Sequence, residues 1–161
     1  MNTRARLLAL ILVLTGALLS VPSAVAIGGH RDGRAAGQER FLILNNNPRT
    51  NANSPVAGFG PIHAKGTDKV LTPHRDRFIF PKGSVVVRHS KTSQSQHYDK
   101  ANCYGRFTET GTWKVVRGTR TYRQASGGGT YRVKGQLIGC SQNRPPKVFQ
   151  LQINAVGRLK Y

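Results

Sequence analysis

The sequence has few acidic residues, few cysteines and no pattern typical of an amphipathic helix. Six Asp and Glu residues stand against 25 Lys and Arg, which gives a formal net charge of +19 at pH 7. The GxSxG motif of serine hydrolases is absent, so hydrolysis has no support. No Cys/His cluster has the spacing of a zinc site, and we expect neither a metal centre nor a cofactor.

Long apolar runs are also scarce, and the one clear run lies near the N-terminus. Residues 7–19 are apolar except for one Thr and one Gly, two arginines precede them, and residues 24–26 form a small-x-small cleavage site. The run is shorter than the ~20 residues that span a bilayer, which disfavours the alternative of a transmembrane anchor. We predict a signal-peptide helix over residues 1–26, membrane contact only during export, and a secreted protein.

The positive charge remains after removal of the signal peptide. Residues 27–161 retain 23 basic and 6 acidic groups, a formal charge of +17, in a chain with room for one domain. Such a surface attracts anionic polymers such as acidic polysaccharides or cell-wall phosphate polymers. The alternative is that the charge keeps a small exported domain soluble. Because the charges are spread along the chain, we expect no specific nucleic-acid recognition.

Short alternating segments separated by Gly, Pro and Asn predict an all-β fold. Residues 41–44 form the first apolar run, residues 58–71 alternate, and a Pro-Lys-Gly turn over 81–83 joins two apolar strands. Residues 90–102 are polar and predict a loop or a strand end, whereas residues 148–155 alternate cleanly.

This pattern indicates six to nine strands, which is typical of a sandwich or a barrel. We predict a small antiparallel β-barrel over residues 41–161, preceded by a flexible leader over residues 27–40. Glycines within the strands are expected at the bulges or bends that a barrel needs to close.

The two cysteines, Cys103 and Cys140, are expected to form a disulfide in an oxidising compartment. The bond would close a loop of about 38 residues and stabilise the fold by about 4 kcal/mol. Cys103 has the parity of the apolar side of its strand, but Cys140 has the opposite parity to Tyr131 and Val133. We therefore expect the bond at the barrel rim, outside the strand ladder.

Several glycine-rich motifs resemble the signature GTW…GGTGxY…GxGTY of bacterial secreted proteins with an allene-oxide-cyclase-like barrel. The resemblance covers residues 41–161 and implies the eight-stranded barrel that plant allene oxide cyclases share with dirigent proteins. Arg117 and Arg120 stand where that family often has glycine. No position matches the catalytic motif of the plant cyclases, so no catalytic role is carried over. The motifs are Gly111-Thr112-Trp113, Gly118-Thr119, Tyr122, Gly127 and Gly129-Thr130-Tyr131, with segments 60–68 and 80–83 also similar to such uncharacterised actinobacterial proteins.

Glu109 is the candidate catalytic residue. It has the parity of Phe107 and Trp113, so a regular strand aims it into the apolar interior, where a carboxyl group can act as a general acid or base. The alternative is that a bend at Gly111 turns it outward, or that an arginine pairs with it. We favour this alternative because buried unpaired carboxylates are rare.

The candidate ligand-binding residues are Trp113, Arg117, Arg120 and Tyr131, whose aromatic rings and guanidinium groups could clamp a polyanion or a sugar. The alternative, which we prefer, is that Trp113 belongs to the core and the arginines form a solvated face. Among the five histidines, His63 and His89 lie in predicted strands and could line one face together.

These observations lead to a function hypothesis with two alternatives. We expect a non-catalytic extracellular or cell-envelope protein whose barrel mouth or basic exterior binds a small hydrophobic ligand or an anionic polymer. The first alternative is an isomerase or cyclase acting on a hydrophobic substrate inside the barrel, by analogy of fold. The second is a cationic effector of membranes or nucleic acid, which rests on net charge alone.

Overall fold

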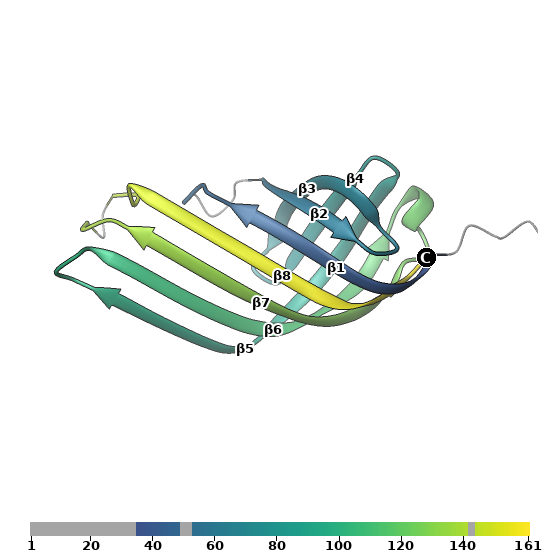
Figure 1. Cartoon of the computed structure of the whole chain (residues 1–161). Coiled ribbons are helices and arrows are strands. Elements are labelled where there is room, and N and C mark those ends of the chain that lie inside the picture. Colours follow the sequence, from purple (N-terminus) through teal and green to yellow (C-terminus); the bar gives the residue numbers. More distant parts are fainter. Residues whose placement is uncertain (1–34, 49–52, 142–143) are drawn as a thin grey trace, which may run out of the picture. The chain divides into compact units, whose positions relative to one another are not determined.

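The computed structural model describes residues 35–48, 53–141 and 144–161, and these form a closed antiparallel β-barrel (Figure 1). Each strand pairs with its neighbours in the chain, and the last strand pairs with the first. The predicted all-β, eight-stranded fold is confirmed. The signal-peptide prediction for residues 1–26 lies outside the described residues. The strands are β1 (Ala36–Asn45), β2 (Ser54–Phe59), β3 (His63–Thr72), β4 (Arg75–Phe80), β5 (Gly83–Asp99), β6 (Tyr104–Gly118), β7 (Ser126–Ile138) and β8 (Val148–Lys160), with a short 3₁₀ helix η1 (Arg120–Tyr122) after β6.

Several strands differ from the bounds that the sequence pattern predicts. Residues 36–40, expected in the leader, belong to β1 and pair with β8, and residues 27–34 of that leader lie outside the described residues. Residues 90–99, expected as a loop or a strand end, continue β5. The single alternating segment 58–71 is divided between β2 and β3. Main-chain ladder bonds to β6 hold residues 90–99 in a strand although none of their side chains is buried.

Strands β5 to β8 continue past the barrel as a curved sheet (Figure 1). Pairing between β4 and β5 ends at Arg88, whereas pairing between β5 and β6 continues to Asp99. Pairing between β7 and β8 likewise reaches Ile138 and Val148. We call this sheet the extension. It consists of residues 90–99 of β5, 104–110 of β6, 133–138 of β7 and 148–153 of β8.

Aromatic rings fill the barrel interior. Phe41 is fully buried, and its ring centroid lies 5.1 Å from that of Phe78 and 5.6 Å from that of Trp113. Trp113 donates a hydrogen bond from Nε1 to the carbonyl oxygen of Val156, 3.2 Å away. Its indole is therefore a core group, as the preferred alternative expected.

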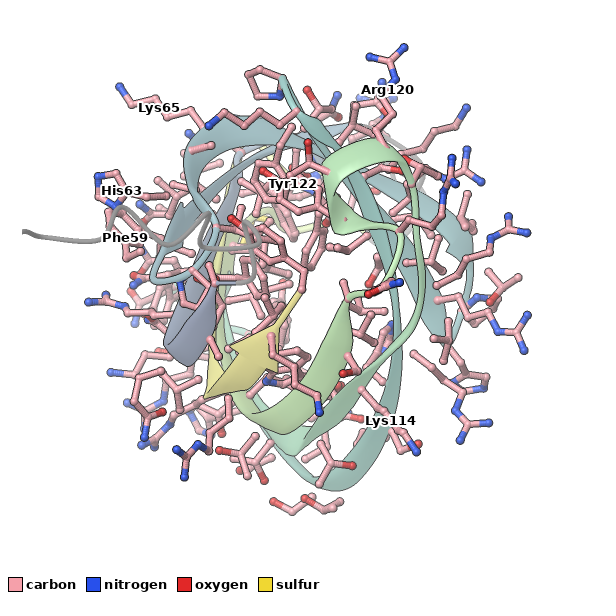
Figure 2. The ribbon with its side chains drawn as sticks, turned by 90° about the vertical axis from the view of Figure 1, so that its right-hand side faces the viewer. Phe59, His63, Lys65, Lys114, Arg120 and Tyr122 are labelled. Atoms are coloured by element: carbon pink, nitrogen blue, oxygen red, sulfur yellow. A yellow bond between two sulfur atoms is a disulfide. The ribbon has the colours of Figure 1, made fainter. Side chains whose placement is uncertain are left out.

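One end of the barrel is closed by η1. Tyr122 is 2% exposed, and its ring lies 6.2 Å from that of Phe80 and 4.8 Å from that of Tyr161. Figure 2 shows Tyr122 inside the ring of strands at this end, with Arg120 pointing outward. Arg120 adopts a φ of 51°, the left-handed conformation that favours glycine.

The predicted disulfide between Cys103 and Cys140 is confirmed, with the two Cα atoms 4.7 Å apart. Cys103 precedes β6 and Cys140 follows β7, so the bond lies outside the strand ladder as predicted. It joins the two strands at the tip of the extension, farther from the barrel than the rim position that we expected. Within the described residues, no helix has the length and apolar character needed to cross a membrane.

Gly83 is predicted to be essential for the closed end. Its φ is +145°, and a Cβ atom there would lie 2.4 Å from the carbonyl oxygen of Thr119. We expect Gly83→Ala to lower the free energy of unfolding by about 2 kcal/mol because of backbone strain and the displaced η1. Gly37→Ala, where the added Cβ meets only Pro61 at 3.8 Å, is the matched control and should change it by less than about 0.5 kcal/mol. Equal stability of the two variants in urea unfolding would contradict the prediction.

Candidate functional site

A cavity of about 90 Å³ lies inside the barrel and opens toward the extension. Its wall is apolar over most of its area, as in typical small-molecule sites. Four polar side chains from four different strands point into it: Asp68 of β3, Asp76 of β4, His89 of β5 and Glu109 of β6. The rest of the wall consists of Ile43, Phe78, Val87, Trp113, Tyr131, Val133, Ile153 and Ala155.

Glu109 faces the cavity and pairs with no described arginine, so the favoured alternative of an outward bend or an arginine partner is wrong. The hydroxyl group of Tyr131 donates a hydrogen bond of 2.7 Å to Oε1 of Glu109. The regular parity of β6 is kept, because the irregularity beside Gly111 adds a residue to β5 and leaves β6 unshifted. Burial, together with the hydrogen bond to Glu109, raises the pKa of the Tyr131 hydroxyl far above its usual value, which keeps it a donor.

Asp68 is the most deeply buried polar group of the cavity. Its side chain is 6% exposed, and its Oδ1 accepts no hydrogen bond from any described residue. Burial raises the pKa of Asp68 to about 7, and the nearby charge of Asp76 acts in the same direction. Near neutral pH this carboxyl group therefore exists in both protonation states.

His89 and Asp76 form the ion pair of the cavity. Nε2 of His89 lies 3.2 Å from Oδ2 of Asp76, and this hydrogen bond raises the pKa of His89 while burial opposes the rise. The His89 ring also lies edge-on to that of Tyr131, with centroids 5.9 Å apart. The pair links the β4 and β5 sides of the cavity to Tyr131 on β7.

Charges of opposite sign are separated between the interior and the exterior of the barrel. Three carboxyl groups face one imidazole in the cavity, and no Lys or Arg of the described residues lines it. Every described Lys and Arg side chain is exposed except Arg77, which is half-buried. Figure 2 shows Lys65, Lys114 and Arg120 pointing away from the barrel. The cavity is thus an acidic site within a strongly basic protein.

Glu39, a fourth buried carboxylate, has a structural role at the closed end. Its Oε1 accepts hydrogen bonds from the main-chain N–H groups of Arg40 and Phe59, and its Oε2 accepts one of 2.8 Å from Ile62. Burial raises the pKa of Glu39, and these three hydrogen bonds oppose the rise. Glu39 therefore anchors the turn between β2 and β3, and both of its carboxylate oxygens have partners.

The structure brings together only part of the predicted site. Trp113 and Tyr131 line the cavity with Glu109, but Arg117 and Arg120 are exposed beside η1 at the closed end. The candidate clamp of aromatic rings and arginines, which we considered but did not prefer, is therefore not assembled. His63 is exposed and points outward, whereas His89 lies in the cavity, so these histidines do not share a face (Figure 2). The described residues contain no cluster of metal ligands.

Sequence reasoning missed Asp68, Asp76 and His89 as members of one site. A signal for Asp68 was available, because it shares the parity of Ile62 and Ala64, which face inward. The other two could not be placed, because their contact depends on the register between strands.

Comparison of the chain with known protein families, with curated proteins and with solved structures gives no significant match.

Asp68→Asn is predicted to change how stability depends on pH. The folded-state pKa of Asp68, about 7, lies above its ordinary value of 3.8, so the wild type loses stability as pH rises between these values. The Asn variant lacks this loss. Its free energy of unfolding relative to wild type should increase by on the order of 3 kcal/mol between pH 4 and pH 8.

Asp99→Asn is the matched control with the opposite sign. Hydrogen bonds from Asn102 lower the pKa of this exposed carboxylate, so its contribution to stability is present above the ordinary value and is lost in acid. Thermal unfolding from pH 4 to pH 8 measures both variants. A stability difference between Asp68→Asn and wild type that stays constant over this range would contradict the prediction.

Proposed function

We propose that this chain is an exported protein that binds a small ligand in the cavity at the mouth of its barrel. The observation that carries the proposal is the buried Oδ1 of Asp68, an acceptor without a partner among the described residues. An unsatisfied buried acceptor costs about 1–3 kcal/mol of stability. A ligand that donates a hydrogen bond to this oxygen removes that cost.

The shape of the barrel supports binding of a small ligand in the cavity. η1 closes one end, the cavity opens at the other, and eight-stranded barrels can enclose one small ligand. Export is supported by the signal-peptide pattern of residues 1–26 and by the disulfide between Cys103 and Cys140. The resemblance to allene-oxide-cyclase-like secreted proteins is in keeping with this proposal.

An anionic polymer is a partner for the exterior and not for the cavity. Carboxyl groups of Asp68, Asp76 and Glu109 repel an anion from the interior, whereas Lys and Arg side chains surround the barrel. Attraction of polyanions to that exterior would be weakened by salt and would leave the cavity free.

Filling the cavity should abolish ligand binding. Ala155 lines the cavity, and the next residue, Val156, is exposed on the outer face of the same strand. Phenylnaphthylamine, a neutral fluorescent probe, is larger than the cavity and can insert only part of one ring, with the rest at the mouth. We expect Ala155→Leu to weaken its binding by at least about tenfold, because the added side chain occupies the space that the inserted part needs. Val156→Leu, the matched control, should bind it within about twofold of wild type. Equal affinity of both variants in a fluorescence titration, with folding checked by thermal unfolding, would refute interior binding.

The second candidate function is acid–base catalysis, as in an isomerase or cyclase acting on a hydrophobic substrate. The observation that favours it is the pKa of Asp68, about 7, in an apolar-walled cavity. A general acid or base is most effective when its pKa is close to the working pH. Tyr131 and Glu109 would orient the substrate beside it through their hydrogen bond.

A nitrobenzisoxazole, whose ring opens when a base removes its C–H proton, tests this second function. If Asp68 is a competent base, the rate constant should rise with pH around a midpoint of about 7, following the ionisation of this carboxyl group. Asp68→Asn should lower the rate by about a hundredfold, and Asp99→Asn should leave it unchanged. A rate in Asp68→Asn equal to that of wild type would exclude Asp68 as a base.

A further inference from the structure

We propose that the ligand is a cationic amphiphile, with an ammonium head in the cavity and an apolar tail along the inner face of the extension. The inference rests on the proposed function, because it names the class of ligand for that same cavity. Two separate features carry it: the acidic polar groups of the cavity, and the apolar surface that continues from the cavity mouth.

The size of the cavity limits what it can hold. Its volume of about 90 Å³ is smaller than the ~150 Å³ of an interior cavity that binds benzene. It therefore accepts a head group of a few heavy atoms, and the remainder of a larger ligand must lie outside the mouth.

The polar groups of the cavity match an ammonium group. An ammonium group carries three donors and no acceptor, and the cavity offers buried acceptors. Oδ1 of Asp68 accepts no hydrogen bond from the described residues, and Tyr131 engages only Oε1 of Glu109. The rings of Tyr131 and Trp113 also line the cavity, where aromatic faces attract cations. Asp76 and His89 pair with each other, so the unpaired charge of the cavity is negative.

An apolar surface leads away from this head-group site. Val133 of β7 pairs with Ile153 of β8 at the cavity, and the next inward pairs toward the tip are Gly135 with Leu151 and Leu137 with Phe149. We call the side chains of Phe107, Leu137, Phe149 and Leu151 the apron.

All four apron side chains are half-buried. Phe107 lies over Gly135, where a Cβ atom would meet its ring, so the apron is continuous from β6 to β8. The extension that carries it projects beyond the barrel mouth (Figure 1). An apolar tail laid on the apron buries surface worth about 25 cal/mol per Å².

Because the exterior is basic, a preference of the protein for cationic over anionic ligands is an informative test of the acidic cavity. A net charge of +19 repels cations at long range and attracts anions nonspecifically. Stronger binding of a cation than of an anion can therefore come only from a local acidic site such as the cavity.

The experiment compares octylamine, octanol and octanoate, which share one tail, as competitors of phenylnaphthylamine at physiological ionic strength. We expect octylamine to bind at least about tenfold more tightly than octanol, and octanoate to bind most weakly at the cavity. Asp68→Asn should reduce the octylamine affinity to that of octanol while leaving octanol unchanged. Glu109→Gln provides a second test of the same preference if Asp68→Asn does not fold.

The affinity for octylamine should also rise from pH 6 to pH 8. Over this range Asp68 ionises, which makes the cavity more negative. The hydrogen bond to Asp76 raises the pKa of His89, the other group of the ion pair. Asp76 and Glu109 are the other titratable groups that face the head-group site besides Tyr131, which stays protonated. Asp99→Asn, outside the cavity, should leave this pH dependence unaltered.

The tail site has its own variant pair. Leu137→Ser should weaken octylamine binding by about fivefold but leave propylamine unchanged, because propylamine is too short to reach the apron. Ile138→Ser, on the outer face of the same strand, is the matched control and should affect neither amine.

The possible failures are distinguishable. If the three octyl compounds displace the probe equally, or if octanoate displaces it best and Asp68→Asn has no effect, the cationic class is wrong and interior binding stands. If none displaces the probe and the NMR signal of the Trp113 indole N–H is unchanged, both the ligand class and the proposed function fail.

Discussion

The pairing of β1 with β8 is the constraint on which the rest of the structure depends. Ten consecutive residue pairs join the first strand to the last and close the ladder. Closure fixes the face on which every side chain lies, because neighbouring residues of a strand point to opposite faces. A shift by one residue would move Arg40 inward and Phe41 outward. The burial of aromatic rings and the exclusion of Lys and Arg from the interior both follow from this one register.

The same register determines on which face of the barrel the few acidic side chains lie. Of six Asp and Glu residues, Glu39, Asp68, Asp76 and Glu109 face the interior, Asp99 lies outside it at the end of β5, and the sixth is outside the described residues. A basic exterior alone would be explained by its effect on solubility. Burying carboxyl groups costs free energy of desolvation, and the two ends of the barrel differ in how far hydrogen bonds offset that cost. Main-chain N–H groups donate hydrogen bonds to both carboxylate oxygens of Glu39 at the closed end. Oδ1 of Asp68 at the mouth accepts none from the described residues.

Strand alternation predicted the fold class, and the presence of two cysteines in a chain expected to be exported predicted the disulfide, because these features depend on local patterns and on residue type. Parity also aimed Glu109 inward, but the rarity of buried carboxylates led us to prefer an outward position, and the donor that stabilises it, Tyr131, lies on another strand. The contact of Asp76 with His89 depends on the register between β4 and β5. The sequence left open whether the polar end of β5 is a loop or a strand end for a related reason: main-chain bonds to β6 hold it as a strand, and these leave no hydrophobic pattern in the sequence.

The closure of one barrel end by Tyr122 makes the cavity a blind pocket with a kinetic consequence. A molecule inside must leave through the opening by which it entered. The half-buried side chains around that opening therefore act on the association and the dissociation rate constants alike. A substitution that makes them more apolar lengthens the residence time of an apolar molecule, because departure requires crossing the same surface. Residence time and affinity in this barrel are consequently set in large part outside its core, on the strands that project from it.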